Sequence, residues 1–268
     1  MELGDSSFKF GSTVVLAYPD ATRLAGYRAV LGLWQQLSSD SKQMCTGHFS
    51  TNDAEQVLHT QSIPEIDSFD INSSGVSVVF GTPTAAIASE LTFCFVNGLP
   101  STEHIPALID GILGLLESHG NVRRLVVPAA ANVSGTREPD RLWVCSTGGG
   151  GGQNMAVAGA REIPEGALTN DVFLSALGNL APMSGIKEVA LLVHGDKRPS
   201  GSGYRQAVVF GREYVDEADA AVVNALGSAL ALVAGVTDTA TQLLPLAVDV
   251  TRTRLDIDAA AKALPAFG

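Results

Sequence analysis

Residues 91–128 have the sequence LTFCFVNGLPSTEHIPALIDGILGLLESHGNVRRLVVP, which predicts a strand, a helix and a second strand. Leu91 to Val96 is apolar almost throughout, as is typical of a strand buried on both faces. Leu125 to Pro128 has the same character. Between them, apolar residues recur at the spacing of one helix face: Ile105, Leu108, Ile109, Ile112, Leu113 and Leu116. This segment is therefore a βαβ unit, the building block of a parallel sheet.

Similar patterns continue on both sides of this unit. Thr13 to Ala17 predicts a strand, and a helical pattern follows as far as Trp34. Val76 to Phe80 predicts another strand, which either forms a hairpin with Leu91 to Val96 or lies apart from it. The later predicted elements are a strand at Arg141 to Cys145, a helix from Asp171 to Leu180 capped by Asp171, a strand at Val189 to His194 and a helix from Asp216 to Val233.

These patterns predict an α/β fold with a largely parallel central sheet and helices on both of its faces. The chain has 268 residues, of which 46% are hydrophobic and 17% charged, so one globular domain over residues 1–268 is expected. We expect a flexible loop at residues 146–168 and a flexible tail at 259–268. The loop contains Gly148 to Gly152 but lacks the Lys and Ser/Thr of a P-loop, which favours a flexible tract over a phosphate site.

The negative net charge of the chain disfavours negatively charged partners. The formal net charge of −11 disfavours nucleic acid and anionic membrane as partners, because both are negatively charged. The short basic stretches are scattered and are predicted to be solvated edges: Arg123-Arg124, Lys197-Arg198 and Arg252 to Arg254. The N-terminus lacks the basic and apolar regions of a signal peptide, so we expect a cytoplasmic or nuclear protein.

Residues with catalytic chemistry do not form a recognisable motif. The three cysteines, Cys45, Cys94 and Cys145, are an odd number without zinc-ligand spacing, so neither a disulfide framework nor a metal or cofactor site is predicted. None of the five histidines lies in a known catalytic motif, and no catalytic residue is predicted.

Three polar residues at the ends or exits of predicted strands are the candidates for a ligand site. Asn97, Ser134 and His194 stand at strand exits, and ligands of open α/β sheets bind outside the carboxyl ends of strands. His194 is the best placed of the three. No partner group in the sequence would make it a base, so a structural role is favoured for all three.

From Leu91 onward the chain resembles the proteasome assembly chaperone family, whose members have a phosphorylase-like α/β fold. The resemblance lies in the order of the predicted elements, and the start of the chain, Ser12 to Leu31, is similar in pattern but lacks the family's usual Gly-Asn-Val-Gly turn. The segments that carry it are Leu91 to Val96, Ile105 to His119, the stretch NVRRLVVP at 121–128, Arg141 to Val144, Ala190 to His194 and Asp216 to Val233.

The resemblance implies a non-catalytic scaffold that pairs with a second assembly chaperone and holds α-type proteasome subunits while their ring forms. Members often end in a hydrophobic-Tyr-any motif that docks between those subunits. This chain ends in Ala266, Phe267 and Gly268, so Phe stands where the family has Tyr. The alternative is a nucleoside- or nucleotide-handling enzyme, because the same fold supports phosphorylases. It is disfavoured because no phosphate clamp of Arg and Ser with a purine-facing acid is recognisable.

Overall fold

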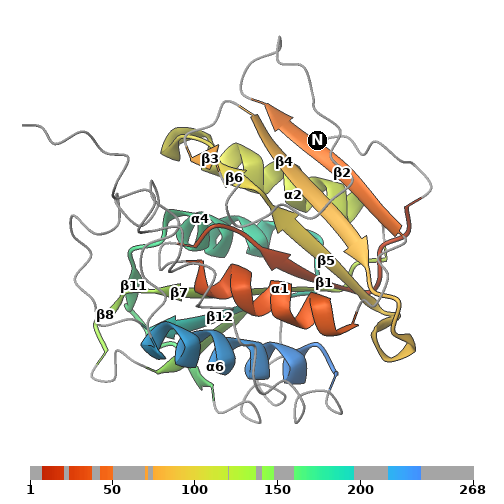
Figure 1. The fold of residues 1–268 in the computed structure, drawn as a ribbon. Coiled ribbons are helices and arrows are strands. Elements are labelled where there is room, and N and C mark those ends of the chain that lie inside the picture. Colours follow the sequence, from red (N-terminus) through yellow and green to blue (C-terminus); the bar gives the residue numbers. More distant parts are fainter. Residues whose placement is uncertain are drawn as a thin grey trace, which may run out of the picture.

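An eight-stranded sheet forms the centre of the computed structural model (Figure 1). The structure describes residues 8–20, 24–37, 43–50, 70–71, 75–119, 121–136, 141–147, 160–195 and 217–236. The strand order is β10-β9-β12-β7-β1-β5-β4-β2. Their bounds are β1 Thr13–Ala17, β2 Gln43–Ser50, β4 Gly75–Thr82, β5 Leu91–Val96, β7 Arg124–Ala131, β9 Leu142–Thr147, β10 Arg161–Glu162 and β12 Glu188–Gly195.

The middle of this sheet is parallel. Strands β12, β7, β1 and β5 run parallel, and antiparallel neighbours, β9 on one side and β4 followed by β2 on the other, flank them. The expected βαβ unit is present as β5, α2 (Ile105–Ser118) and β7, but β1 lies between its two strands. Val76 to Phe80 forms a hairpin with Leu91 to Val96, because β4 pairs antiparallel with β5 and places Val78 opposite Val96.

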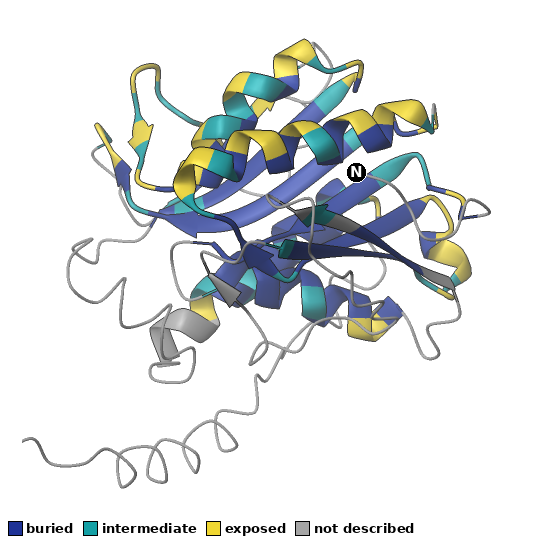
Figure 2. Cartoon of the chain, turned by 90° about the horizontal axis from the view of Figure 1, so that it is seen from above, coloured by how far each residue is buried: buried dark blue, intermediate teal, exposed yellow. Residues whose placement is uncertain are grey.

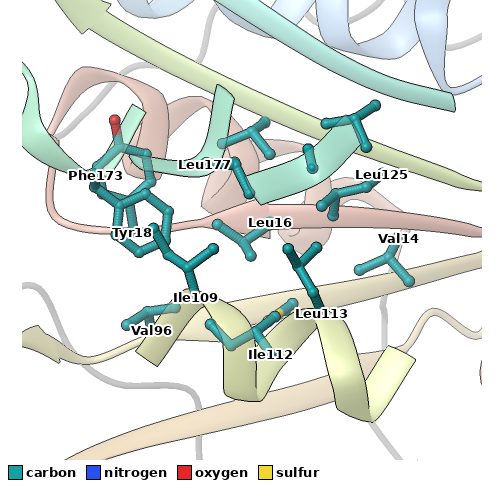
Figure 3. Packing of buried hydrophobic residues seen from close by; sticks show 14 of the residues in the cluster. Val14, Leu16, Tyr18, Val96, Ile109, Ile112, Leu113, Leu125, Phe173 and Leu177 are labelled. Atoms are coloured by element: carbon teal, nitrogen blue, oxygen red, sulfur yellow. The ribbon is translucent and has the colours of Figure 1, made fainter. Parts of the chain in front are cut away.

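Helices cover both faces of the sheet, as the sequence predicts. Helices α1 (Ala25–Leu37) and α6 (Glu217–Val233) lie on one face, and α2 and α4 (Val172–Leu180) lie on the other (Figures 1 and 2). Successive side chains of β1 point to opposite faces of the sheet, so an apolar core forms on each face. Val14 and Leu16 join the cluster below α2 and α4, whereas Val15 and Ala17 join the cluster below α1 and α6. Figure 3 shows Leu16 beside Ile109 of α2.

Shorter elements complete the described part of the chain. Two small ladders pair β11 (Leu168–Thr169) with β8 (Val133–Ser134) and β3 (Asp70–Ile71) with β6 (Gly98–Leu99). The 3₁₀ helices are η2 (Ala86–Ala88), η3 (Thr102–His104) and η4 (Ala181–Met183). No helix among the described residues is long and apolar enough to span a membrane.

The predicted start of α4 is confirmed. Asp171 has an extended backbone, and its Oδ1 accepts a hydrogen bond from the Leu174 N–H at 2.9 Å. This is the geometry of a helix N-cap, in which a side-chain oxygen satisfies an otherwise unpaired amide of the first turn.

The predicted flexible segments lie largely outside the described residues. Gly148 to Gly152 and the tail at 259–268 are both outside them. At the ends of the expected loop at 146–168, residues 146–147 belong to β9 and Arg161–Glu162 form β10. Flexibility of the part between them stays a prediction.

Strand β2 was not expected from the sequence. Its residues, QMCTGHFS, contain few apolar positions and no run of β-branched residues. All eight nevertheless pair with β4 across the ladder from Gln43 opposite Thr82 to Ser50 opposite Gly75. Backbone pairing with an established neighbour makes this segment a strand, because an outer strand can satisfy its amides without the apolar pattern of a central one.

The prediction that both members of the Arg123-Arg124 pair are solvated is wrong for Arg124. Its guanidinium donates from Nε to Glu188 Oε2 at 2.9 Å, and its Nη2 lies 2.8 Å from the same oxygen. Its Nη1 donates to the Val233 carbonyl at 3.2 Å. Arg124 therefore links β7, β12 and the end of α6, whereas Arg123 is exposed. The sequence did not reveal this difference, because the partners of Arg124 lie 64 and 109 positions away in the chain.

Candidate functional site

The three candidate ligand residues use their polar atoms within the fold. Asn97 Oδ1 accepts from the Ser77 N–H at 2.8 Å and so ties β5 to β4. The Ser134 hydroxyl donates to the Leu168 carbonyl at 3.3 Å, between β8 and β11. His194 Nδ1 donates to the Gly195 carbonyl at 2.9 Å.

The structure does not bring these three residues together. His194 is in β12 and Asn97 follows β5, and β7 and β1 lie between those strands. Three steps of about 4.8 Å separate them by about 14 Å across the sheet. Ser134 lies beyond the end of β7, in the separate ladder with β11. Ligand binding at any one of them stays a prediction, but they do not form a common site.

A buried carboxylate at the same edge of the sheet was not singled out from the sequence. Asp20 follows β1, and its Oδ2 accepts from the Gly26 N–H at 2.5 Å and from the Ala130 N–H at 3.4 Å. The β1–β7 ladder ends at Val15 opposite Val126, so the Ala130 amide has no partner on β1. Asp20 occupies that gap and joins the start of α1 to β7, which gives this buried acid a structural task.

Two of the described thiols, those of Cys94 and Cys145, are poor nucleophiles. Burial, with a smaller contribution from Cys45, raises the pKa of the Cys94 thiol well above its usual value. Burial, followed by the charge of Glu162, raises the pKa of the half-buried Cys145. Because the thiolate is the reactive form, both groups are held in the inert state at neutral pH. Among the described residues there is also no group of three or more His, Cys, Asp or Glu side chains that could hold a metal ion.

Three of the four exposed large apolar side chains among the described residues lie at or near the two ends of α4. Leu168 precedes α4 and is 69% exposed, Val172 is its first residue and is 45% exposed, and Met183 just beyond its end is 82% exposed. The helix itself, VFLSALGNL, has no charged residue. We call Leu168, Val172 and Met183 the α4 surface. In the opposite helix layer, α1 exposes only Gln35 and Gln36, which are polar. Figure 2 shows the alternation of exposed and buried residues along the helices. Exposed apolar side chains beside an uncharged helix make this surface a candidate contact region for another protein.

The fold is similar to solved structures of proteasome-related proteins. PbaA of Pyrococcus furiosus, described as an archaeal homolog of proteasome-assembly chaperone, aligns over 94% of this chain and 99% of its own with a TM-score of 0.52 and 13% identity. PbaB of the same organism, described as an archaeal proteasome activator, aligns over 97% of this chain and 98% of its own with a TM-score of 0.55 and 14% identity.

No protein-family model and no curated protein matches the sequence. The similarity therefore rests on the fold. It defines the chain as an α/β protein with a mostly parallel, mixed central sheet. More particularly, the chain has the fold of the proteasome-assembly chaperone homologues, which confirms the resemblance seen in its sequence.

Proposed function

We propose that this protein is a non-catalytic chaperone that binds α-type proteasome subunits during ring assembly, as a pair with a second chaperone. The observation that supports this most is the similarity of fold to PbaA and PbaB over nearly the full length of all three chains. The dispersal of Asn97, Ser134 and His194 also supports it, because a catalytic site requires convergent groups. The buried Asp20 is already used by the fold.

The α4 surface is the best described candidate for the contact with a subunit. The buried centre of a protein interface is depleted of charged residues and contains large apolar side chains. The uncharged helix α4 and its exposed neighbours Leu168 and Met183 fit that description. The terminal Ala266-Phe267-Gly268 is proposed as a second contact, with Phe267 as its anchor, since aromatic residues are enriched among interface hot spots.

The double variant Leu168→Glu, Met183→Glu is expected to bind purified α-type subunits about tenfold more weakly or worse, because two charges would have to be buried in the interface. Its melting temperature should be nearly unchanged, since both side chains are exposed. Affinity is measured by surface plasmon resonance with subunits of the same organism. The matched control is Gln36→Glu, which adds a charge on the exposed part of α1 in the opposite layer. Equal losses in the control and the double variant would contradict the α4 surface as the contact.

Removal of residues 266–268 is expected to weaken capture of the same subunits while leaving the melting temperature nearly unchanged. Three terminal residues contribute little to a core, whereas an anchoring aromatic contributes to binding. Phe267→Ala should reproduce the effect of the truncation, and Phe267→Tyr should retain or improve binding. Full capture by the truncated chain would exclude the tail as a contact. Failure of the intact protein to bind any α-type subunit would reject the chaperone proposal itself.

A further inference from the structure

A cavity of about 740 Å³ opens at the amino ends of the parallel strands, opposite to the edge where the sequence placed its ligand candidates. Four separate segments line it: residues 9–12 before β1, 82–83 at the end of β4, 89–90 before β5, and Asn121 and Arg123 before β7. Its volume lies within the roughly 300–1,000 Å³ typical of small-molecule sites.

Hydrogen bonds and a close backbone contact fix the positions of the segments that line this cavity. The Gly11 N–H donates to Thr92 Oγ1 at 2.8 Å, and the Thr13 N–H donates to the Glu90 carbonyl at 3.0 Å. The Ser12 carbonyl accepts from the amides of Arg123 and Arg124 at 2.8 and 3.1 Å. A Cβ on Gly11 would lie 2.3 Å from the Glu90 carbonyl oxygen, so the two backbones are in direct contact. The lining segments before β1, β5 and β7 are thus preorganised relative to one another.

The polar side chains around the cavity are not engaged by the fold. In the part of the chain that the structure describes, Lys9, Glu90 and Arg123 form no ion pair. Within the same residues, the hydroxyl of Ser12 and the side-chain amide of Asn121 make no hydrogen bond. The side chains of Arg124, Ser134 and His194 differ from these, because each of them forms a hydrogen bond within the fold. These polar side chains line one cavity, are exposed or half-buried and have no partner in the described part of the fold, so they are available to a ligand.

The charges of the lining favour an anion. Lys9 and Arg123 contribute two positive charges and Glu90 one negative charge, so the lining is net positive in a protein whose formal net charge is −11. A guanidinium matches a phosphate group through two parallel hydrogen bonds, and an ammonium adds a point charge. Hydroxyl and amide donors, here Ser12 and Asn121, are the usual additional partners of phosphate oxygens.

We propose that this cavity binds a small phosphate ester that carries hydroxyl groups, of the sugar phosphate class, with Arg123 and Lys9 on the phosphate and Glu90 on a hydroxyl. A carboxylate only accepts hydrogen bonds, so Glu90 requires a donor on the ligand, and a ligand hydroxyl supplies it. The cavity is large enough for such a molecule. This site is independent of the proposed chaperone function, because it lies at the amino edge of the sheet and uses none of the α4 surface.

The test is titration of the full-length protein with ribose 5-phosphate, inorganic phosphate and ribose by isothermal calorimetry. We expect saturable binding of ribose 5-phosphate, weaker binding of inorganic phosphate and none of ribose. Arg123→Gln and Lys9→Gln should each weaken the binding of both phosphates about tenfold, as expected for loss of a charge-assisted hydrogen bond. Glu90→Gln should weaken ribose 5-phosphate relative to inorganic phosphate, because only the sugar offers it a hydroxyl.

The matched control is Lys187→Gln, which removes one exposed positive charge at the start of β12, on the same edge but outside the lining. It should leave the affinity within about twofold, since exposed charges beyond contact distance are screened by salt. Amide chemical shifts of Gly11, Ser12 and Arg123 should move on titration. Absence of saturable binding of ribose 5-phosphate to the intact protein would overturn the proposal, as would equal effects of Arg123→Gln and Lys187→Gln.

Discussion

Replacing Gly26 by alanine is expected to destabilise the protein by about 3 kcal/mol, at the upper end of the range for overpacking. The added Cβ would lie 2.1 Å from the Pro128 carbonyl oxygen, a backbone atom of β7 that cannot move aside as a flexible side chain could. Displacement of α1 would also lengthen the hydrogen bond from the Gly26 N–H to Asp20. Urea unfolding followed by circular dichroism measures the loss.

Gly114→Ala is the matched control, because it adds the same methyl group to a helix. Gly114 is an exposed residue of α2, and nothing lies within 4 Å of the position of its Cβ. Alanine there should stabilise the protein by about 0.5–1 kcal/mol through its higher helix propensity. The two substitutions should thus have opposite signs. If Gly26→Ala were as well tolerated as Gly114→Ala, the close approach of α1 to β7 would be contradicted.

Phe95→Ala is expected to cost about 3–5 kcal/mol, as is typical of removing a buried aromatic ring. Phe95 is fully buried on β5, and its ring centroid lies 5.7 Å from that of Tyr27 and 6.0 Å from that of Trp34. Its removal would leave a cavity between the sheet and α1. The measurement is again urea unfolding, with near-ultraviolet circular dichroism as a second signal for the packing of these rings.

Phe95→Leu should cost clearly less than Phe95→Ala, because it fills most of the volume and loses mainly the aromatic contacts. Equal losses of stability in the two variants would mean that stability does not depend on the volume filled at position 95. That result would contradict the placement of Phe95 in the core. Phe93 on the same strand lies 6.3 Å away and remains in both variants, so the difference between them reports on position 95 alone.

Elements with strong apolar periodicity were predicted well. The strand Thr13–Ala17 has the predicted bounds, and Leu91–Val96 does as well. Helix α4 begins after its predicted cap, Asp171. These predictions succeeded because burial on one or both faces requires apolar residues at regular positions. This periodicity is visible within a short stretch of sequence. The α/β class follows from the order of those elements, and the structure confirms it.

The candidate sites were predicted less well, because a site depends on residues far apart in the chain. Asn97 follows β5 and His194 lies near the end of β12, but the strand order separates them. Arg124 was expected to be solvated, and its pairing with Glu188 joins residues 64 positions apart. Strand β2 was missed because its partner β4, and not its own composition, makes it a strand.

The sequence alone was sufficient to predict most of the central strands and helices and that they form an α/β fold with helices on both faces of a largely parallel sheet. Periodicity is a local property of the chain, and burial imposes it residue by residue. The insertion of β1 between β5 and β7 and the contact of Gly26 with Pro128 came only from the folded chain. So did the cavity at the amino edge, which four segments line. Each of these features depends on contacts between segments that are far apart in the chain. Such contacts do not impose a regular pattern of apolar residues, so the sequence does not display them.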